Sequence, residues 1–297
     1  MREAVLFVIF DMNDTPIKVG IQGVAGCFHD AAASEYFGDR AIEVVEFDTF
    51  NDMFDALRAD ASLVAVAAIE NTIAGSLLSN HELLRQSDVR IMGEHKKRIS
   101  HVLCALPGQS IDDIEEVNSH PMALMQCEQW LRSHPHMKMV EHFDTAGSAR
   151  DIAAEGLKGH AAVCGEYAAR LYGMEILAEG IETNKHNFTR FLILADPLMA
   201  QELAPVEKDV NKASLMFTLP HAAGALSKVL AIMSFYDMNL SKIQSTPIIG
   251  REWEYRFYVD LTFDSLLRYH QAIDAVRPLI NDFKILGEYR AYDHEQH

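Results

Sequence analysis

The segment Asn187-Phe188-Thr189-Arg190-Phe191 sets a carboxamide, a hydroxyl and a guanidinium side by side. Amide and guanidinium groups hold anions, and a hydroxyl can donate its proton to a reacting atom. Residues 183–187 are polar whereas 191–194 are apolar and β-prone, so the trio falls where a turn enters a strand. The segment therefore predicts an anion site with a proton donor. The alternative is an edge strand whose Thr189 and Arg190 only face water.

A second polar segment, Glu70-Asn71-Thr72, follows a predicted strand over 63–69, and Gly75-Ser76 precede a predicted helix over 77–85. A strand, a polar turn and a helix entrance can present a carboxamide, two hydroxyls and free amides to one bound carboxylate. The alternative is a capped helix, in which Thr72 and Ser76 only satisfy backbone N–H groups. Capping and binding are compatible.

A glycine-containing loop over 22–32 follows a short predicted strand and opens a helix. Glycines such as Gly26 let backbone amides approach an anion at a helix N-terminus, where the dipole favours negative charge. His29 in this loop is either a ligand contact or a neutral residue at the helix end. Turn glycines are common, so this signal is weaker than the one at Asn71.

Composition restricts the class of protein. With 297 residues, 49% of them hydrophobic and 23% charged, the chain can form two or three compact units. A net charge of -17 disfavours nucleic acid and anionic membrane surfaces as partners. The four cysteines form no C-x-x-C pair and the histidines show no ligand spacing, so we expect reduced thiols, a cytoplasmic protein and no metal. The apolar run 4–10 is short, is preceded by Arg2 and Glu3, and is followed by Asp11 without a small-residue cleavage pattern, so we do not expect a signal peptide.

The elements that must position these residues alternate between strand and helix from about 18 to 194, which predicts an α/β fold with largely parallel strands. Residues 1–17 form an N-terminal extension. Residues 197–211 are apolar-poor and contain two prolines, so we expect a linker there. The basic run His95-Lys96-Lys97-Arg98 is read as a solvated surface turn; the alternative is a patch that steers a dianion.

The part after the linker is predicted as a separate unit of order βαββαβ. Leu226, Val229, Leu230 and Met233 define one face of a helix, and Leu266 to Ile280 gives a second amphipathic helix. From Trp253 to Leu261 apolar residues alternate strictly with polar ones, which predicts a strand whose polar face is solvated. About 80 residues in this order make a ferredoxin-like module.

The motifs together support a resemblance to a known family. The C-terminal unit, with Gly224-Ala225-Leu226 at its first helix, resembles an ACT domain, and the preceding 175 or so residues resemble the prephenate dehydratase family. The Glu70-to-Ser76 loop is similar to the family's E-N-S-x-x-G-S loop, with Thr72 in place of Ser. Ser119-His120-Pro121 and Gln126-Cys127 match its S-H-P and Q-C pairs, and Thr145-Ala146-Gly147-Ser148 resembles its hydroxyl-rich helix start. The resemblance implies a monofunctional enzyme.

The resemblance implies a two-lobed catalytic domain over 18–196, arranged like a periplasmic binding protein, followed by a ferredoxin-like ACT domain over 212–291. Lobe one would hold about 18–93 plus 184–196, and lobe two about 101–181. Motifs from both lobes would then meet at one ligand, although they are more than 100 residues apart in the chain.

The implied reaction converts prephenate to phenylpyruvate with loss of water and carbon dioxide, without a metal or organic cofactor. The resemblance assigns the hydrogen bond to the leaving hydroxyl to Thr189. It gives catalytic roles also to Asn71, Thr72 and Gln126, while Cys127 is read as a core thiol. The expected substrate-binding residues are Gly26, Gly75, Ser76, Thr145, Ser148, Asn187, Arg190 and Phe191.

The ACT resemblance implies that phenylalanine binds where Gly224, Ala225 and Leu226 meet a partner subunit, in a homodimer or homotetramer, and inhibits the enzyme. Gln244 and Ser245 would also contact this effector. They belong to Gln244-Ser245-Thr246-Pro247, where the family commonly has E-S-R-P. Two alternatives remain open at this point: arogenate dehydratase, and a non-catalytic amino-acid sensor.

Overall fold

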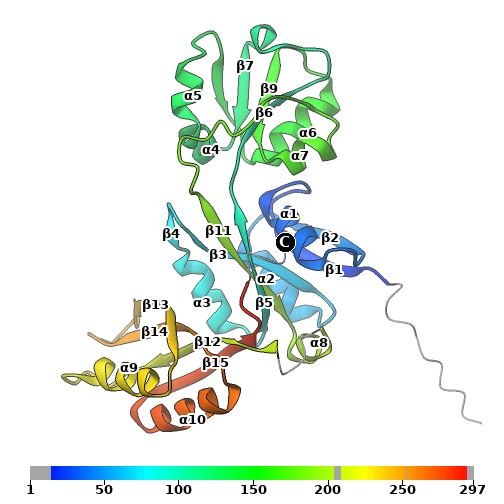
Figure 1. Ribbon diagram of the computed structural model, residues 1–297. Coiled ribbons are helices and arrows are strands. Elements are labelled where there is room, and N and C mark those ends of the chain that lie inside the picture. The colour runs from blue at the N-terminus through cyan, green and yellow to red at the C-terminus, as the bar shows by residue number, and fades with distance from the viewer. Residues whose placement is uncertain (1–14, 204–208, 252, 293–297) are drawn as a thin grey trace, which may run out of the picture.

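The computed structural model describes residues 15–203, 209–251 and 253–292. Three units follow one another from top to bottom in Figure 1, namely lobe two, lobe one and the C-terminal domain. The predicted N-terminal extension and the apolar run 4–10 lie almost wholly outside the described residues. No helix in the described segments is long and apolar enough to cross a membrane.

Lobe one is built on a six-stranded sheet of order β2-β1-β3-β11-β5, with β4 added to β3. The first three strands in the sequence are parallel, and β11 runs antiparallel between β3 and β5. The strands are β1 (Ile17–Gln22), β2 (Ile42–Phe47), β3 (Val64–Asn71), β4 (Gly75–Ser76), β5 (Arg90–Arg98) and β11 (Phe188–Ala195). The helices are α1 (Phe28–Phe37), α2 (Phe50–Ala59), α3 (Leu78–Gln86) and α8 (Pro197–Leu203).

The two faces of β11 enter different cores because successive side chains on a strand point to opposite faces. Phe191 and Ile193 join a core that includes residues of α1 and α8. Leu192 and Leu194 join a second core with residues of α2, α3 and the C-terminal domain. Strand β11 is therefore covered on both faces.

Lobe two is a five-stranded sheet of order β10-β6-β9-β7-β8 flanked by helices. Its strands are β6 (Val102–Ala105), β7 (Glu116–Ser119), β8 (Lys138–Glu141), β9 (His160–Cys164) and β10 (Glu175–Ala178). Its helices are the short η1 (Ile111–Asp113), α4 (Pro121–Gln126), α5 (Glu128–Arg132), α6 (Thr145–Glu155) and α7 (Glu166–Leu171).

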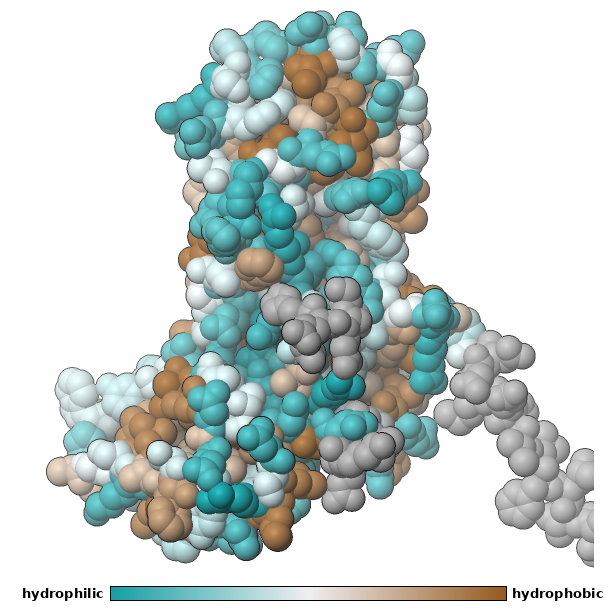
Figure 2. Space-filling model, viewed as in Figure 1, coloured by the Kyte–Doolittle hydropathy of each residue, from teal (hydrophilic) through white to brown (hydrophobic). Residues whose placement is uncertain are grey.

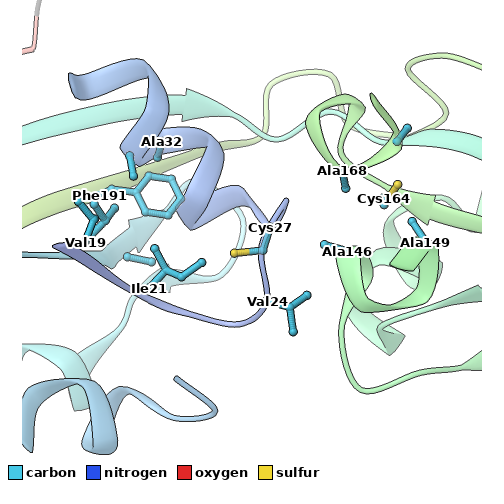
Figure 3. Close-up of a cluster of buried hydrophobic side chains, with 14 of the residues drawn as sticks. Val19, Ile21, Val24, Cys27, Ala32, Ala146, Ala149, Cys164, Ala168 and Phe191 are labelled. Atoms are coloured by element: carbon cyan, nitrogen blue, oxygen red, sulfur yellow. The ribbon is translucent and has the colours of Figure 1, made fainter. Parts of the chain in front are cut away.

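The chain crosses twice between the lobes, from β5 to β6 and from β10 to β11, as the two-lobed interpretation requires. The crossings run side by side: the Ile99 amide donates to the Asn187 carbonyl at 2.8 Å, and the Ile181 amide to the His101 carbonyl at 3.0 Å. In Figure 3, Val24 and Cys27 lie between core side chains of lobe one and those of lobe two, so the lobes also touch through the loop before α1.

The C-terminal domain has the predicted order βαββαβ. Its antiparallel sheet has the order β13-β14-β12-β15. The strands are β12 (Lys212–Thr218), β13 (Asn239–Pro247), β14 (Tyr255–Thr262) and β15 (Asn281–Tyr289), and the helices are α9 (Ala225–Phe235), α10 (Leu266–Val276) and the short η3 (Arg277–Leu279). The helical apolar faces pack on Val259 and Leu261 in one core.

Two expectations for this half of the chain need correction. The polar face of β14 is not solvated: Tyr258 and Asp260 are buried, because this face of the sheet packs against lobe one. Trp253 lies before the strand and is 70% exposed. The predicted linker is partly helical, since Asp196 caps α8 by accepting from the Leu198 amide at 2.9 Å, and Ala200 is buried against lobe one.

Candidate active site

A cavity of about 310 Å³ lies between the lobes. Figure 2 shows mainly hydrophilic residues on the surface over this middle region, where the strands cross. The lining comes from both lobes and from both crossings, and includes the carboxamides and the hydroxyl that the sequence singled out, but not the guanidinium. It comprises Gln22, Cys27, Phe28, His29, Ala68, Asn71, Ala74, Leu77, Ile99, His101, His120, Met122, Ala123, Gln126, Asp144, Thr145, Asn187, Thr189 and Phe191.

Asn71 and Thr189 face each other across paired strands, Asn71 at the end of β3 and Thr189 near the start of β11. The Asn71 amide nitrogen donates to Thr189 Oγ1 at 2.9 Å and to Asn187 Oδ1 at 2.7 Å. The Asn71 oxygen accepts from the backbone amides of Ile73 and Ala74, both at 2.9 Å. Because the oxygen is fixed by two backbone donors, the orientation of this carboxamide is determined by its hydrogen bonds.

This arrangement leaves the Thr189 hydroxyl proton available for another partner. Thr189 Oγ1 accepts a hydrogen bond from Asn71, and within the described part of the chain no acceptor lies within hydrogen-bonding distance for its own proton. Thr189 is only 8% exposed, so few directions are open to that proton. The hydroxyl is thus available as a donor to a molecule in the cavity.

A chain of amides extends from this pair into lobe two. Asn187 Nδ2 donates to Gln126 Oε1 at 3.3 Å, and His101 Nε2 lies 3.0 Å from the same oxygen. Burial lowers the pKa of His101, although Gln126 raises it in part, so the ring is neutral and its Nε2–H is the donor. With its oxygen accepting twice, Gln126 keeps its amide hydrogens for other partners.

The apolar side of the cavity contains groups that are neutral at pH 7. Burial lowers the pKa of His29 to about 4, and its ring makes an edge contact with Phe191. His29 Nε2 accepts from the Ala68 amide at 3.4 Å. Burial raises the pKa of the Cys27 thiol to about 12. Neither group is a charged ligand contact, and Cys27 is not an activated nucleophile.

The only carboxylate in the described lining is that of Asp144, and the lining contains no lysine or arginine. Asp144 is the N-cap of α6 and accepts from the Gly147 amide at 2.8 Å through Oδ1. Thr145 starts the helix beside it and also lines the cavity. Bound anions must therefore be held by neutral donors and helix ends.

Three predicted contacts instead build the turn that carries Asn71. Thr72 Oγ1 donates to the His186 carbonyl at 3.0 Å and accepts from the Phe188 amide at 2.9 Å, so its hydroxyl ties the β3 end to the β11 entrance. Gly75 and Ser76 form β4, which pairs with β3. None of the three lines the cavity. Their side of the hairpin positions Asn71 and does not reach the ligand space.

The predicted contacts at Gly26 and Ser148 also lie outside the lining. The Gly26 amide donates to Asp30 Oδ2 at 2.7 Å and is not free for an anion. Gly26 has φ +86°, and a Cβ there would lie 3.1 Å from the Cα of Ala168, so glycine permits close approach of the lobes. Ser148 Oγ donates to the Asp144 carbonyl at 2.8 Å within α6.

Arg190 was expected to bind substrate, but it points away from the cavity. It follows Thr189 on a strand, so its side chain takes the opposite face, where it bonds to Glu94, Asp260 and the Tyr289 hydroxyl. The basic run is likewise not a surface turn. It belongs to β5, with His95 buried and Lys97 paired with Glu35.

Residues 19–198 match the family described as Prephenate dehydratase. The chain belongs to the prephenate dehydratase family. A curated relative, arogenate dehydratase/prephenate dehydratase 2 of Arabidopsis thaliana, is 34% identical over 290 residues, which cover 93% of this chain and 74% of that protein. The enzyme is therefore a dehydrating, decarboxylating lyase of the prephenate and arogenate dehydratase type.

Two solved structures support the fold of this dehydratase over more than nine tenths of its length. Prephenate dehydratase of Arthrobacter aurescens in complex with L-Phe has a TM-score of 0.78, with 26% identity, 92% of this chain and 90% of that chain covered. A protein described as a novel type of quorum quenching acylase has a TM-score of 0.80, with 26% identity, 94% of this chain and 100% of that chain covered. The two-lobed, periplasmic-binding-protein-like architecture is thus shared.

Two polar cavity residues of this dehydratase were missed by sequence reasoning. Asp144 carried a readable signal, since an aspartate directly before Thr145 and three residues before Gly147 suits an N-cap. His101 carried none, because only the crossing of the chain brings it to Gln126.

Proposed function

We propose that the cavity binds prephenate and converts it to phenylpyruvate, with Thr189 donating the hydrogen bond to the departing ring hydroxyl. The observation that carries this proposal is the hydrogen bond from Asn71 to Thr189 Oγ1, which leaves the threonine proton for the ligand. As the bond from the ring to its carboxylate breaks, the electron pair moves through the ring and expels the hydroxyl. The carboxylate leaves as carbon dioxide, and the hydroxyl, hydrogen-bonded to Thr189, takes up one proton supplied in net by solvent and leaves as water.

A threonine is a weak acid, so orientation and electrostatic complementarity supply much of the rate. In this scheme Asn71 orients the donor, and Gln126 and Asn187 offer neutral amides to the substrate. Thr145 and the start of α6 bind a carboxylate, and Phe191 with Leu77 shields the ring carboxylate from water. We assign Thr72, Gly75 and Ser76 to the support of Asn71.

The proposal is tested by incubating the purified protein with prephenate and, separately, with arogenate at mildly alkaline pH. Phenylpyruvate and phenylalanine are quantified against a protein-free blank. Formation of either product above the blank supports a dehydratase and distinguishes it from a sensor that only binds. Absence of both products would reject the proposal.

A second candidate substrate, arogenate, is favoured by Asp144. Prephenate and arogenate share two carboxylates, but arogenate has an ammonium where prephenate has a ketone. A lining with one carboxylate and no lysine or arginine suits the ligand with the smaller negative charge. At about 4 Å an ion pair near a protein surface gains on the order of 4 kcal/mol before desolvation. Several of the similar curated proteins are named arogenate dehydratases.

Asp144→Asn separates the two substrates, because asparagine is as good an N-cap as aspartate and leaves α6 intact. We expect the ratio of kcat/KM for arogenate over prephenate to fall by about tenfold or more, which is about 1.4 kcal/mol. The melting temperature should not change. An unaltered ratio would remove Asp144 as the ammonium partner.

We further infer that residues 212–291 form an ACT domain and residues 18–196 the catalytic domain, and that phenylalanine inhibits through the former. The order βαββαβ and the exposed glycine at the start of α9 support this assignment. Gly224, Ala225 and Leu226 at that helix start and Gln244 and Ser245 on β13 remain the proposed effector contacts. Titration with phenylalanine at millimolar levels, without inhibition or binding, would contradict it.

Acyl transfer is not supported by the cavity of this chain, despite the similarity to the acylase. Among the described lining residues, no serine, threonine or cysteine has a histidine within hydrogen-bonding distance. The Cys27 thiol instead lies 3.6 Å from the Gln22 carbonyl. A hydroxyl or thiol nucleophile is activated by such a base, by a lowered pKa or by a metal ion, and burial raises the pKa of Cys27.

A further inference from the structure

The residues directly beside the proposed catalytic pair form a second pair on the opposite face of the same sheet. Thr189 pairs with Asn71 between β11 and β3, and Arg190 pairs with Glu70 at the next position. Since side chains alternate along a strand, one pair enters the cavity while the other faces the C-terminal domain. Adjacent positions on β11 and on β3 thus contact the cavity on one face of the sheet and the C-terminal domain on the other.

Arg190 is anchored mainly by the C-terminal domain. Its Nη1 donates to Asp260 of β14, and its Nη2 donates to the Tyr289 hydroxyl of β15 at 2.9 Å. Its Nε donates to Glu94 of β5 at 2.6 Å. All of the guanidinium nitrogens are therefore engaged, and the planar fork restricts rotation and translation of the side chain.

The network around Arg190 is buried and balanced in charge. Lys212 of β12 donates to both oxygens of Glu94 at 2.8 Å. Ser214 donates to Asp260 at 2.6 Å. The two cations Arg190 and Lys212 thus form ion pairs with two carboxylates, those of Glu94 and Asp260. Removal of one partner leaves a buried charge uncompensated, which makes each member sensitive to the others.

Glu70 makes the matching contact one strand away. Its carboxylate accepts from Lys242 of β13 at 3.0 Å, and Lys242 is only 8% exposed in its side chain. Arg190 lies 4.0 Å from the same carboxylate. Arg190 and Glu70, which adjoin Thr189 and Asn71 in the sequence, are consequently both bonded to the C-terminal sheet.

We propose that Arg190 and Glu70 are positioning residues, through which Asp260 and Lys242 of the C-terminal sheet hold Thr189 and Asn71 in catalytic register. This inference rests on the proposed role of Thr189 as donor. A shift of Arg190 moves the adjoining peptide and with it the hydroxyl, and a displacement of about 1 Å at a reacting group can cost about 10²-fold in rate. The effect falls on kcat, because other groups hold the carboxylates.

Two variants of the C-terminal domain test this inference without touching the cavity. Asp260→Asn removes one carboxylate from Arg190 with little change in shape, and Lys242→Met removes the partner of Glu70. The matched control is Lys284→Met. Lys284 is also a lysine of the C-terminal sheet that contacts lobe one, but it donates to the Ser87 carbonyl at 2.6 Å, beyond the C-terminus of α3.

We expect kcat to fall about tenfold or more in Asp260→Asn and about threefold or more in Lys242→Met, with KM within about twofold. Lys284→Met should keep kcat, even if its melting temperature falls as much. In a Thr189→Val background, Asp260→Asn should lower kcat no further, because it acts through Thr189. A merely structural effect would multiply with Thr189→Val.

The outcomes distinguish this inference from the proposed function. A wild-type protein that converts neither prephenate nor arogenate overturns the function itself. An active wild type with unchanged kcat in both Asp260→Asn and Lys242→Met overturns the inference alone, as does an equal loss of kcat in Lys284→Met. If Asp260→Asn does not fold, Lys242→Met decides, since its partner Glu70 is 40% exposed and tolerates the loss.

Discussion

The Thr189→Val substitution isolates the proposed donor, because valine keeps the branched shape and loses only the hydroxyl. In the wild type Asn71 donates to Thr189 Oγ1 at 2.9 Å, so the threonine proton is directed to the ligand. Removal of one positioned donor at a reacting oxygen costs about 10²–10³-fold in kcat, or about 3–4 kcal/mol. We expect a loss in this range.

The cost in folding stability should be much smaller. Without the threonine oxygen, the Asn71 amide still donates to Asn187 Oδ1 at 2.7 Å, and the Phe188 carbonyl lies within 3.3 Å. The Asn71 amide therefore keeps an acceptor, and we expect the substitution to lower the folding stability by about 1 kcal/mol. The loss of transition-state stabilisation thus exceeds the loss of folding free energy by about 2 kcal/mol or more.

The assay measures initial rates at saturating substrate, with whichever of prephenate or arogenate the wild type converts faster. Thr189→Ser, which keeps the hydroxyl, should retain kcat within about tenfold of wild type, and chemical denaturation should confirm that both variants fold. A folded Thr189→Val protein that turns over within about threefold of wild type would contradict the role of Thr189 as donor. A loss of kcat in Thr189→Ser as large as that in Thr189→Val would contradict it as well.

Three further predictions address the amide chain, the buried charges and the contact between domains. Gln126→Leu should lower kcat/KM by about 10- to 100-fold, because two donors lose their shared acceptor; steady-state kinetics would disprove this by showing a change of less than twofold. Burial raises the pKa of Glu94, but Arg190 and a neighbouring lysine outweigh burial and hold it at about 2. The contribution of Glu94 to stability is therefore complete above about pH 4.5 and is lost as the pH falls toward about 2. In Glu94→Gln the unfolding free energy should therefore fall less steeply below pH 4.5, by up to about 1.4 kcal/mol per pH unit. Equal slopes for wild type and variant in denaturant titrations would argue against this role of Glu94. Gly287→Ala should destabilise by about 1–3 kcal/mol, because a Cβ there would overlap the Ile91 carbonyl oxygen of β5; an unchanged melting temperature would exclude this tight contact.

Local pattern was sufficient for the order of elements. Helical spacing from Leu226 to Met233 and strand alternation through Leu261 correspond to α9 and β14, because amphipathic periodicity records which side chains enter the nearest core. The same alternation wrongly predicted that the second face of β14 is exposed to solvent. Tyr258 and Asp260 are buried by a different domain, and a polar residue in a strand does not reveal whether water or a buried arginine is its partner.

The side-chain period of a strand already predicts the position of Arg190. Consecutive residues on a strand cannot face the same side, so Thr189 and Arg190 could not both reach one ligand. The motif itself, read as a group of polar residues, suggested otherwise. The strand period is the stronger constraint, and the structure follows it.

Residue types and their local spacing are enough to predict the order of strands and helices and the family. Which polar groups meet depends on tertiary packing. Hydrogen bonds among Asn71, Gln126 and Asn187 join residues up to 116 positions apart, and they form because two chain crossings bring the lobes together. Tertiary packing likewise left Thr72 and Gly26 as parts of the scaffold, because their polar groups already had partners within the protein.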